Sequence, residues 1–172
     1  MEFAIPLVMR WLHILSATIA VGGMIFVGIV LHPAMAKGLA VDQVDAFREL
    51  MMKRWKLVFH PLILVFLVSG FYNYMMVTAP RHADDGGYHM MFGIKFLLAL
   101  IFFALGIIAT STMKWSEKMR QGKGLWLAVM LAGIALVMIG GYMKSLPFTS
   151  NVVNGEVTLI APSDGAKADP AT

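Results

Sequence analysis

Residues 7–31 read LVMRWLHILSATIAVGGMIFVGIVL, an apolar run in which Arg10 and His13 are the only titratable side chains. A helix needs about 20 residues to span the ~30 Å hydrocarbon core of a bilayer, because each residue advances it by about 1.5 Å. In lipid, a single apolar segment can satisfy its backbone hydrogen bonds only as a helix. This stretch therefore predicts a transmembrane helix.

Three further segments have the same character, at residues 57–77, 90–113 and 125–143. Of the 172 residues, 59% are apolar and 14% are charged, whereas ordinary globular chains carry roughly 25% charged residues. One small core could not keep so much apolar surface away from water. We therefore predict an all-α membrane protein, with a bundle of four transmembrane helices in residues 1–148 and the lipid bilayer as its surroundings.

The chain contains no cysteine. This excludes disulfides, iron–sulfur clusters, thiolate zinc sites and covalently attached c-type haem. Any metal must therefore be held by histidine, methionine or oxygen ligands. The sequence also lacks the nucleotide-binding and hydrolase motifs, and none of the four spans contains a pair of carboxylates. We assign no catalytic residue.

The basic residues are distributed unevenly between the connections. One side of the predicted bundle carries Lys37, Arg48, Lys53, Arg54, Lys56, Lys114, Lys118, Arg120 and Lys123. The other side carries Arg10, Arg81, Lys144 and Lys167. Because basic loops stay in the cytoplasm, this asymmetry predicts that both termini lie outside it. It also explains the net charge of +4 without a nucleic-acid partner.

Two segments outside the spans have patterns of their own. Residues 42–56 place apolar side chains at helical spacing opposite charged ones, which predicts a short amphipathic helix on the cytoplasmic membrane surface. Whether it runs into the second span is left open. Residues 149–172 form a predicted extracytoplasmic tail, in which Asn154-Gly155 between two short apolar runs indicates a hairpin. The end of the tail is expected to be disordered.

Polar side chains inside a membrane bundle are costly and therefore mark candidate sites. In the first span, Arg10 and His13 share a helical stripe with the small residues Ser16, Ala17, Ala20 and Gly23. Small residues let a neighbouring helix approach closely, so His13 is expected to point into the bundle. A similar stripe in the third span places Lys95 inside.

The histidines fall at two depths. His13 and His32 are separated by 19 residues, or about 28 Å of helix, and cannot bind one group. His13 can meet His89 or His82 near the outer side, and His32 can meet His60 near the inner side. Two such layers suit two b-type haems, each held by axial histidines from different helices.

These histidines also have structural interpretations. His32 and His60 precede Pro33 and Pro61, and a residue before proline marks a helix boundary, where an imidazole can simply solvate the helix end. His82 lies close to acidic residues and is expected in a solvated loop. His13 is harder to explain in this way, because an unpartnered imidazole at membrane depth is costly. A role as a ligand or in proton handling is therefore weighed against a purely structural one.

Methionine suggests a second chemistry. Of the 15 methionines, several map to the outer ends of the spans: Met9, Met75, Met76, Met90, Met91 and Met143. Thioether sulfur favours Cu(I), especially beside imidazole, although methionine also fills apolar cores. The candidate copper ligands are His13, His89, Met9, Met90 and Met91.

Residues 11–17 (WLHILSA), 21–24 (VGGM) and 31–34 (LHPA) resemble the copper-resistance D (CopD-like) family of bacterial inner-membrane proteins. The likeness continues through Arg54-Trp55 and Ser69-Gly70 to residues 93–96 (GIKF), and leaves the tail outside. The resemblance implies a multi-pass inner-membrane protein that handles copper at its outer face. It also implies a periplasmic copper protein as a partner.

The same residues are similar to the HemJ-type protoporphyrinogen oxidases, which share the first-helix Leu-His, a proline in the second span and a lysine in the third. That likeness implies bound haem b and best supports His13 and Lys95. The chain departs from the HemJ-type pattern late in the third span, where it reads Leu105-Gly106-Ile107 instead of carrying a Tyr-His pair.

Three functions fit these observations. The first is copper binding or transport at the outer face. The second is a b-type haem protein that transfers electrons to a membrane redox partner or oxidises a porphyrin or quinol. In that case His13 is the axial ligand, Arg10 or Lys95 pairs with the propionates, and any enzyme activity is that of a haem-dependent membrane oxidoreductase. The third is a structural subunit that binds no metal.

Overall fold

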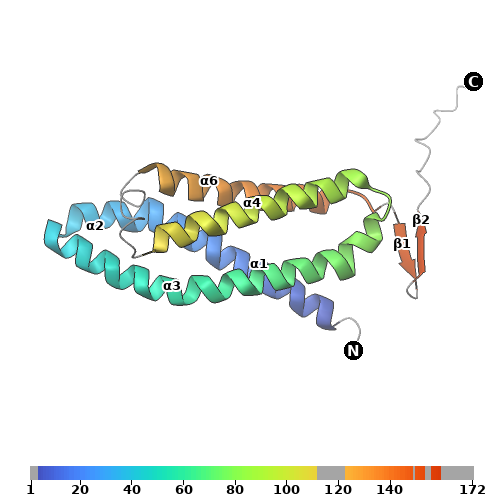
Figure 1. The fold of residues 1–172 in the computed structure, drawn as a ribbon, viewed down its shortest axis with the longest axis horizontal. Helices are drawn as coiled ribbons and strands as arrows, with labels where there is room; N and C mark the ends of the chain where they lie inside the picture. Colours follow the sequence, from blue (N-terminus) through green and yellow to red (C-terminus); the bar gives the residue numbers. More distant parts are fainter. Residues whose placement is uncertain (1–3, 112–122, 149, 154–155, 160–172) are drawn as a thin grey trace, which may run out of the picture.

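Four long helical runs lie side by side in the computed structural model (Figure 1), which describes residues 4–111, 123–148, 150–153 and 156–159. The first run comprises α1 (Ala4–Phe26), the π-helix η1 (Val27–Leu31) and α2 (His32–Gly38). The second comprises α3 (Val41–Tyr72), the π-helix η2 (Asn73–Thr78) and the 3-10 helix η3 (Ala79–His82). The third and fourth are α4 (Gly86–Thr110) and α6 (Lys123–Ser145).

All four runs are long and apolar enough to cross a membrane, which confirms the four predicted spans. The first two extend beyond the predicted limits, because helical structure continues on both sides of the apolar segments. They cover Ala4–Gly38 and Gln43–His82 as candidate spans. The direction in which the bundle crosses the membrane stays a prediction.

The prediction that Pro33 and Pro61 mark helix boundaries is wrong. Pro33 lies in the first turn of α2, directly after the π-helix, and Pro61 lies inside α3. In η1 the backbone N–H of His32 bonds to the carbonyl of Val27, five residues back. This wider turn accommodates a proline within a helical run, because it relieves the clash between the ring and the preceding carbonyls.

The amphipathic segment predicted at residues 42–56 is not a separate helix. It is the first part of α3, which runs without a break into the second span. Only part of its apolar face packs inside the bundle: Met52 is 1% exposed and Trp55 lies against Gly23 of α1, whereas Phe47 is 45% exposed. The position of this end relative to a membrane surface stays a prediction.

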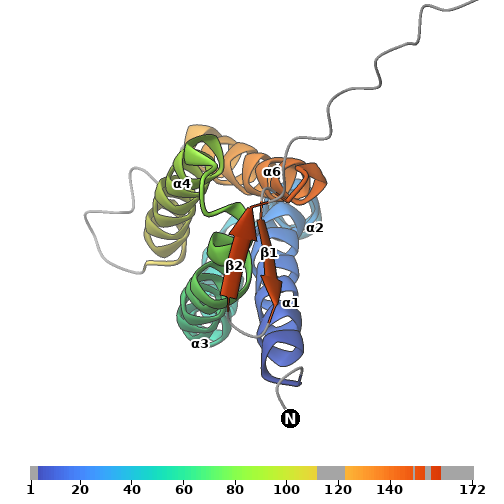
Figure 2. The same ribbon diagram turned by 90° about the vertical axis from the view of Figure 1, so that its right-hand side faces the viewer.

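The helices associate as two pairs. α1 packs mainly on α3, and α4 packs mainly on α6; Figure 2 shows these pairs end-on. Away from the hairpin, the pairs meet in a close-packed core that includes Met24, Phe59, Phe102 and Val129, which are at most 1% exposed. Gly106 of α4 makes room there, because a Cβ on it would lie 2.5 Å from Phe59 Cζ.

A two-stranded antiparallel sheet follows α6. It consists of β1 (Ser150–Val153) and β2 (Glu156–Leu159), with Val152 opposite Val157, where the sequence indicates a hairpin. The predicted turn residues, 154–155, and the tail after residue 159 lie outside the described residues. β1 lies against η3, so that the sheet covers the same end of the bundle as the connection between α3 and α4 (Figure 1). We call this the hairpin end.

Candidate functional site

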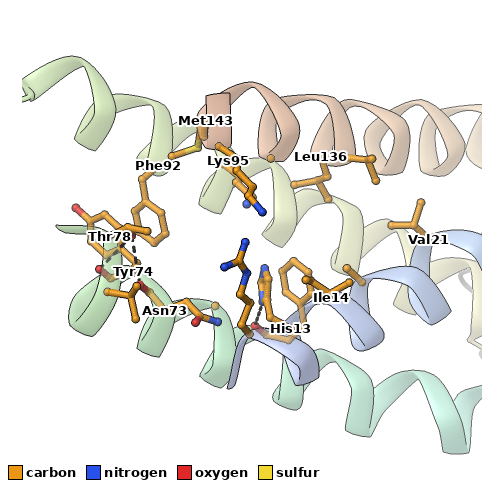
Figure 3. Close-up of a pocket in the computed structure, with 18 of the residues that line it drawn as sticks. His13, Ile14, Val21, Asn73, Tyr74, Thr78, Phe92, Lys95, Leu136 and Met143 are labelled. Carbon is orange, nitrogen blue, oxygen red and sulfur yellow. Dashed lines mark hydrogen bonds between the residues drawn. The ribbon is translucent and has the colours of Figure 1, made fainter. Parts of the chain in front are cut away.

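A cavity of about 700 Å³ lies between the two helix pairs near the hairpin end. Its wall is formed by α1 from Arg10 to Ile25, the end of α3 with η2 and η3, α4 from Tyr88 to Phe103, and the end of α6. Figure 3 shows the side chains of His13, Tyr74, Lys95 and Met143 around it. We call it the His13 cavity.

His13 is fixed by α3. Its Nδ1 lies 3.1 Å from the backbone carbonyl oxygen of Phe66 and 3.4 Å from Ser69 Oγ, and its ring lies against the Phe66 ring at 4.3 Å. A carbonyl oxygen can only accept, so Nδ1 is the protonated nitrogen. Nε2 then carries the free lone pair. Among the described residues, none forms a hydrogen bond with Nε2.

Gly70 determines where the His13 ring can lie. A Cβ on Gly70 would be 2.7 Å from His13 Cε1 and 3.0 Å from His13 Nδ1. Real Cβ atoms do not make contacts this short, so any larger residue would displace the imidazole. Gly70 belongs to the Ser69-Gly70 pair of the CopD-like resemblance. Its missing side chain leaves the space that the His13 ring occupies.

Basic side chains line the cavity, and the described residues of its wall include no carboxylate. Arg10, Arg81, Lys95 and Lys144 all contribute to its wall, and none of the described residues that line it is Asp or Glu. Lys95 crosses from α4 toward α6, where its Nζ lies 3.3 Å from the place that a Cβ on Gly140 would take. Lys95 and His13 extend into the cavity from opposite sides (Figure 3).

The π-helix η2 supplies polar groups to the cavity wall. Asn73 Nδ2 donates to the carbonyl of Ser69 at 2.8 Å, and Thr78 Oγ1 donates to that of Tyr74 at 3.2 Å. The Tyr74 ring stacks on Phe92 of α4 at 3.5 Å. π-Helical turns are frequent at functional sites, because the wide turn re-aims its side chains. The sequence offered only the nearby Pro80 as a signal for this turn.

His82 is buried, and the prediction that it lies in a solvated loop is wrong. Its exposure is 1%. Its ring stacks on Tyr88 at 3.8 Å, and its Nδ1 lies 3.7 Å from Asp85 Oδ2. Phe148, which also lines the cavity, meets the edge of the ring at 5.5 Å. The local sequence is polar, so only the fold reveals that aromatic rings cover this imidazole.

Of the five candidate copper ligands, only His13 lines the cavity. His89 Nδ1 is instead 2.8 Å from the hydroxyl of Tyr74. Met90 is 63% exposed on α4, whereas Met9 and Met91 are half-buried. Within the described ranges, no group of three or more His, Asp or Glu side chains is placed to hold a metal ion. The copper site stays a prediction.

The other predicted pair, His32 and His60, lies away from the cavity. His32 meets the ring of Trp126 edge-on at 4.3 Å, and its Nε2 is buried without a hydrogen-bond partner among the described residues. His60 is exposed and donates from Nδ1 to the carbonyl of Lys56 in its own helix, at 2.9 Å. The imidazoles of His32 and His60 therefore contact different residues.

Comparison with known proteins gives no relative: no family model, no curated protein and no solved structure matches the chain. The chemistry of the His13 cavity is therefore the basis for assigning a function.

Proposed function

We propose that the chain is a membrane protein that binds b-type haem in the His13 cavity, with His13 as the axial ligand. The observation that supports this proposal is the hydrogen bonding of the His13 imidazole. Nδ1 is held by the Phe66 carbonyl, and Nε2, with its lone pair, has no partner among the described residues. Histidines that bind a metal usually donate their other ring N–H to a carbonyl or carboxylate in this manner.

The size and lining of the cavity support the same proposal. About 700 Å³ falls in the range of roughly 300–1,000 Å³ that is typical of ligand and cofactor sites. The rings of Phe66, Phe92, Phe102 and Phe103 contribute to its wall. A large, flat and mostly apolar macrocycle would bury these rings from water, which is favourable in proportion to the apolar area covered.

The charge of the cavity supports an anionic ligand. Arg10 and Lys95 line it, and no carboxylate of the described residues forms an ion pair with either. Cations inside a membrane bundle are costly unless an anion accompanies them. The two propionates of a haem would supply that charge, with Arg10 and Lys95 as the donors. A bound haem would supply one-electron redox chemistry for exchange with a membrane partner.

Copper handling is the second candidate. The observation that favours it is Met143, a buried thioether that lines the cavity together with His13. Sulfur and imidazole are suitable ligands for Cu(I). The CopD-like and HemJ-type resemblances each agree with one of the two candidates, so the choice between them depends on experiment.

The test is a titration of the purified, detergent-solubilised protein with haemin, followed by its Soret absorption. We expect stoichiometric binding by the wild type. His13→Ala should weaken haemin affinity by more than about 100-fold, which exceeds the usual effect of losing an outer-shell partner. His60→Ala is the matched control, because this exposed histidine does not line the cavity.

An equal affinity of His13→Ala and His60→Ala for haemin would contradict the proposal. Elemental analysis of the same samples tests the second candidate. Copper that co-purifies with the wild type and is lost in His13→Ala, without any Soret band in either sample, would favour copper instead.

A further inference from the structure

Three buried nitrogen atoms lack hydrogen-bond partners at the end of the bundle opposite the hairpin. His32 begins α2, Arg48 lies in the first part of α3 and Trp126 lies in the first turn of α6, all at that end (Figure 1). His32 Nε2, Arg48 Nε and Trp126 Nε1 are each buried and form no hydrogen bond with the described residues. We call these three side chains the Arg48 cluster. None of them lines the His13 cavity.

His32 connects the other two members of the cluster. Its ring meets the Trp126 ring at 4.3 Å with an interplanar angle of 88°, and Arg48 lies close enough for its charge to act on His32. Arg48 precedes Met52 by four residues, and Met52 is only 1% exposed, so Arg48 shares the inward face of α3. Three separate helical runs therefore bring these nitrogen atoms to one region.

The contact between the two rings cannot satisfy the whole cluster. In an edge-on pair, one ring directs its edge toward the face of the other, so only one of the two rings can donate an N–H to its neighbour. Arg48 Nε and Trp126 Nε1 can act only as donors. Because a buried donor without an acceptor is destabilising, the cluster needs an acceptor from outside the described residues.

The Arg48 guanidinium makes an anion the most suitable acceptor. Its planar set of N–H groups matches the oxygens of a phosphate, and hydrogen bonds to an anion are stronger than those to a neutral group. Asp45 Oδ1 lies 3.5 Å from Arg48 Nη1, but the Asp45 side chain is 80% exposed. This carboxylate therefore pairs with the outer part of the guanidinium and leaves the buried Nε without a partner.

The position of the cluster along the helices agrees with a phospholipid head group. The apolar segments of the first and fourth runs are residues 7–31 and 125–143, so His32 and Trp126 lie at the ends of these segments. Head groups lie directly beyond the ~30 Å hydrocarbon core of a bilayer. Basic pockets between transmembrane helices bind phosphate-containing head groups at this level.

We propose that the Arg48 cluster binds the phosphate of an anionic phospholipid between α2, α3 and α6. Arg48 Nε and Trp126 Nε1 donate to the phosphate oxygens, and His32 Nε2 donates as well when it carries the ring proton. The phosphate then joins the two helix pairs, because α3 belongs to one pair and α6 to the other. The lipid site is independent of the function of the His13 cavity.

The test titrates the delipidated, detergent-solubilised protein with phosphatidylglycerol or phosphatidylcholine. Native mass spectrometry resolves each bound lipid and gives the dissociation constant of the first. The wild type should prefer phosphatidylglycerol. Arg48→Gln should weaken its binding by about tenfold and Trp126→Phe by about fivefold, as expected for the loss of a charged and of a neutral donor. Trp126→Phe keeps an aromatic ring beside His32, so it tests the N–H even if Arg48→Gln does not fold.

Two matched variants serve as controls. Arg54→Gln removes the same charge from an exposed position of α3, and Trp11→Phe removes an indole N–H at a residue of α1 that is 61% exposed. Both should keep the wild-type affinity for phosphatidylglycerol. Equal weakening in Arg48→Gln and Arg54→Gln, together with wild-type affinity in Trp126→Phe, would overturn the proposal.

Inorganic phosphate distinguishes a lipid from a free anion. The melting temperature of the detergent-solubilised protein is measured in potassium phosphate and in potassium chloride of equal ionic strength. If the wild type shows no lipid preference, a rise in phosphate that is lost in Arg48→Gln and kept in Arg54→Gln would support the phosphate site and reject a lipid as its source. The absence of both a lipid preference and a rise would overturn the site itself.

Discussion

The two halves of the bundle are built from the same four helical runs but are packed in opposite ways. In the half away from the hairpin, side chains such as Met24, Phe59 and Val129 close the space between the helix pairs. In the half near the hairpin, the pairs enclose the His13 cavity instead. Since lipid surrounds both halves in the proposed setting, the difference comes from the residues that face inward.

Glycine has a different role in each half. Gly23 and Gly106 of the packed half lie against the rings of Trp55 and Phe59, which thereby reach the interior. Gly70 of the cavity half lies against His13. In the first case the missing side chain lets an apolar ring fill the core, and in the second it gives an imidazole a fixed place at the edge of an open space. Close approach therefore stabilises the core in one half, and in the other half it fixes the imidazole that we propose as the ligand-binding group.

The largest effect that the comparison predicts is on stability in the packed half. Phe59 is completely buried, so Phe59→Ala should lower the free energy of unfolding by about 3–5 kcal/mol. Leu136→Ala, at a residue that is 6% exposed and lines the cavity, should cost about 2 kcal/mol, because part of its surroundings is already open. Unfolding in mixed micelles, followed by circular dichroism, measures both.

Leu64→Ala is the control for both variants, since the Leu64 side chain is 65% exposed on the outer surface of the bundle. It should leave the free energy of unfolding close to the wild-type value. Equal losses in Phe59→Ala and Leu136→Ala would contradict the distinction between a packed half and a cavity half.

A smaller effect is expected on ligand binding from Gly70→Ala. The added methyl group would displace the His13 ring and stretch its bond to the Phe66 carbonyl. Loss of such an outer-shell partner typically weakens binding by about 10–100-fold. A haemin titration with Soret detection measures the change. Gly93→Ala is the matched control, because nothing lies within 4 Å of a Cβ at that position of α4, and a comparable weakening there would show that the effect is not specific to His13.

The sequence predicts the four spans because hydropathy and length are local properties. It also predicts that His13 faces a neighbouring helix, since small residues share its stripe, and the contacts with Phe66 and Gly70 confirm this. Lys95 lines the cavity for the same reason. These predictions succeed because one helix face is sufficient to make them.

Features that depend on two distant segments could not be predicted. His82 is buried because Tyr88 and Phe148 cover it, and no local pattern relates these residues. The continuity of the helices at Pro33 and Pro61 depends on the whole helical run, whereas a single proline suggests a break. The position of His89 beside Tyr74 rather than in the cavity depends on how η2 lies against α4, which hydropathy does not specify.

In the proposed function, the Nε2 atom of His13 coordinates the ligand in the cavity. The most direct test replaces His13 by glycine and adds imidazole to the haemin-loaded variant. We predict that His13→Gly loses the wild-type Soret position and that imidazole restores it, because the free imidazole can occupy the space of the missing ring. A His13→Gly variant that keeps both the wild-type spectrum and the wild-type haemin affinity without imidazole would contradict the claim.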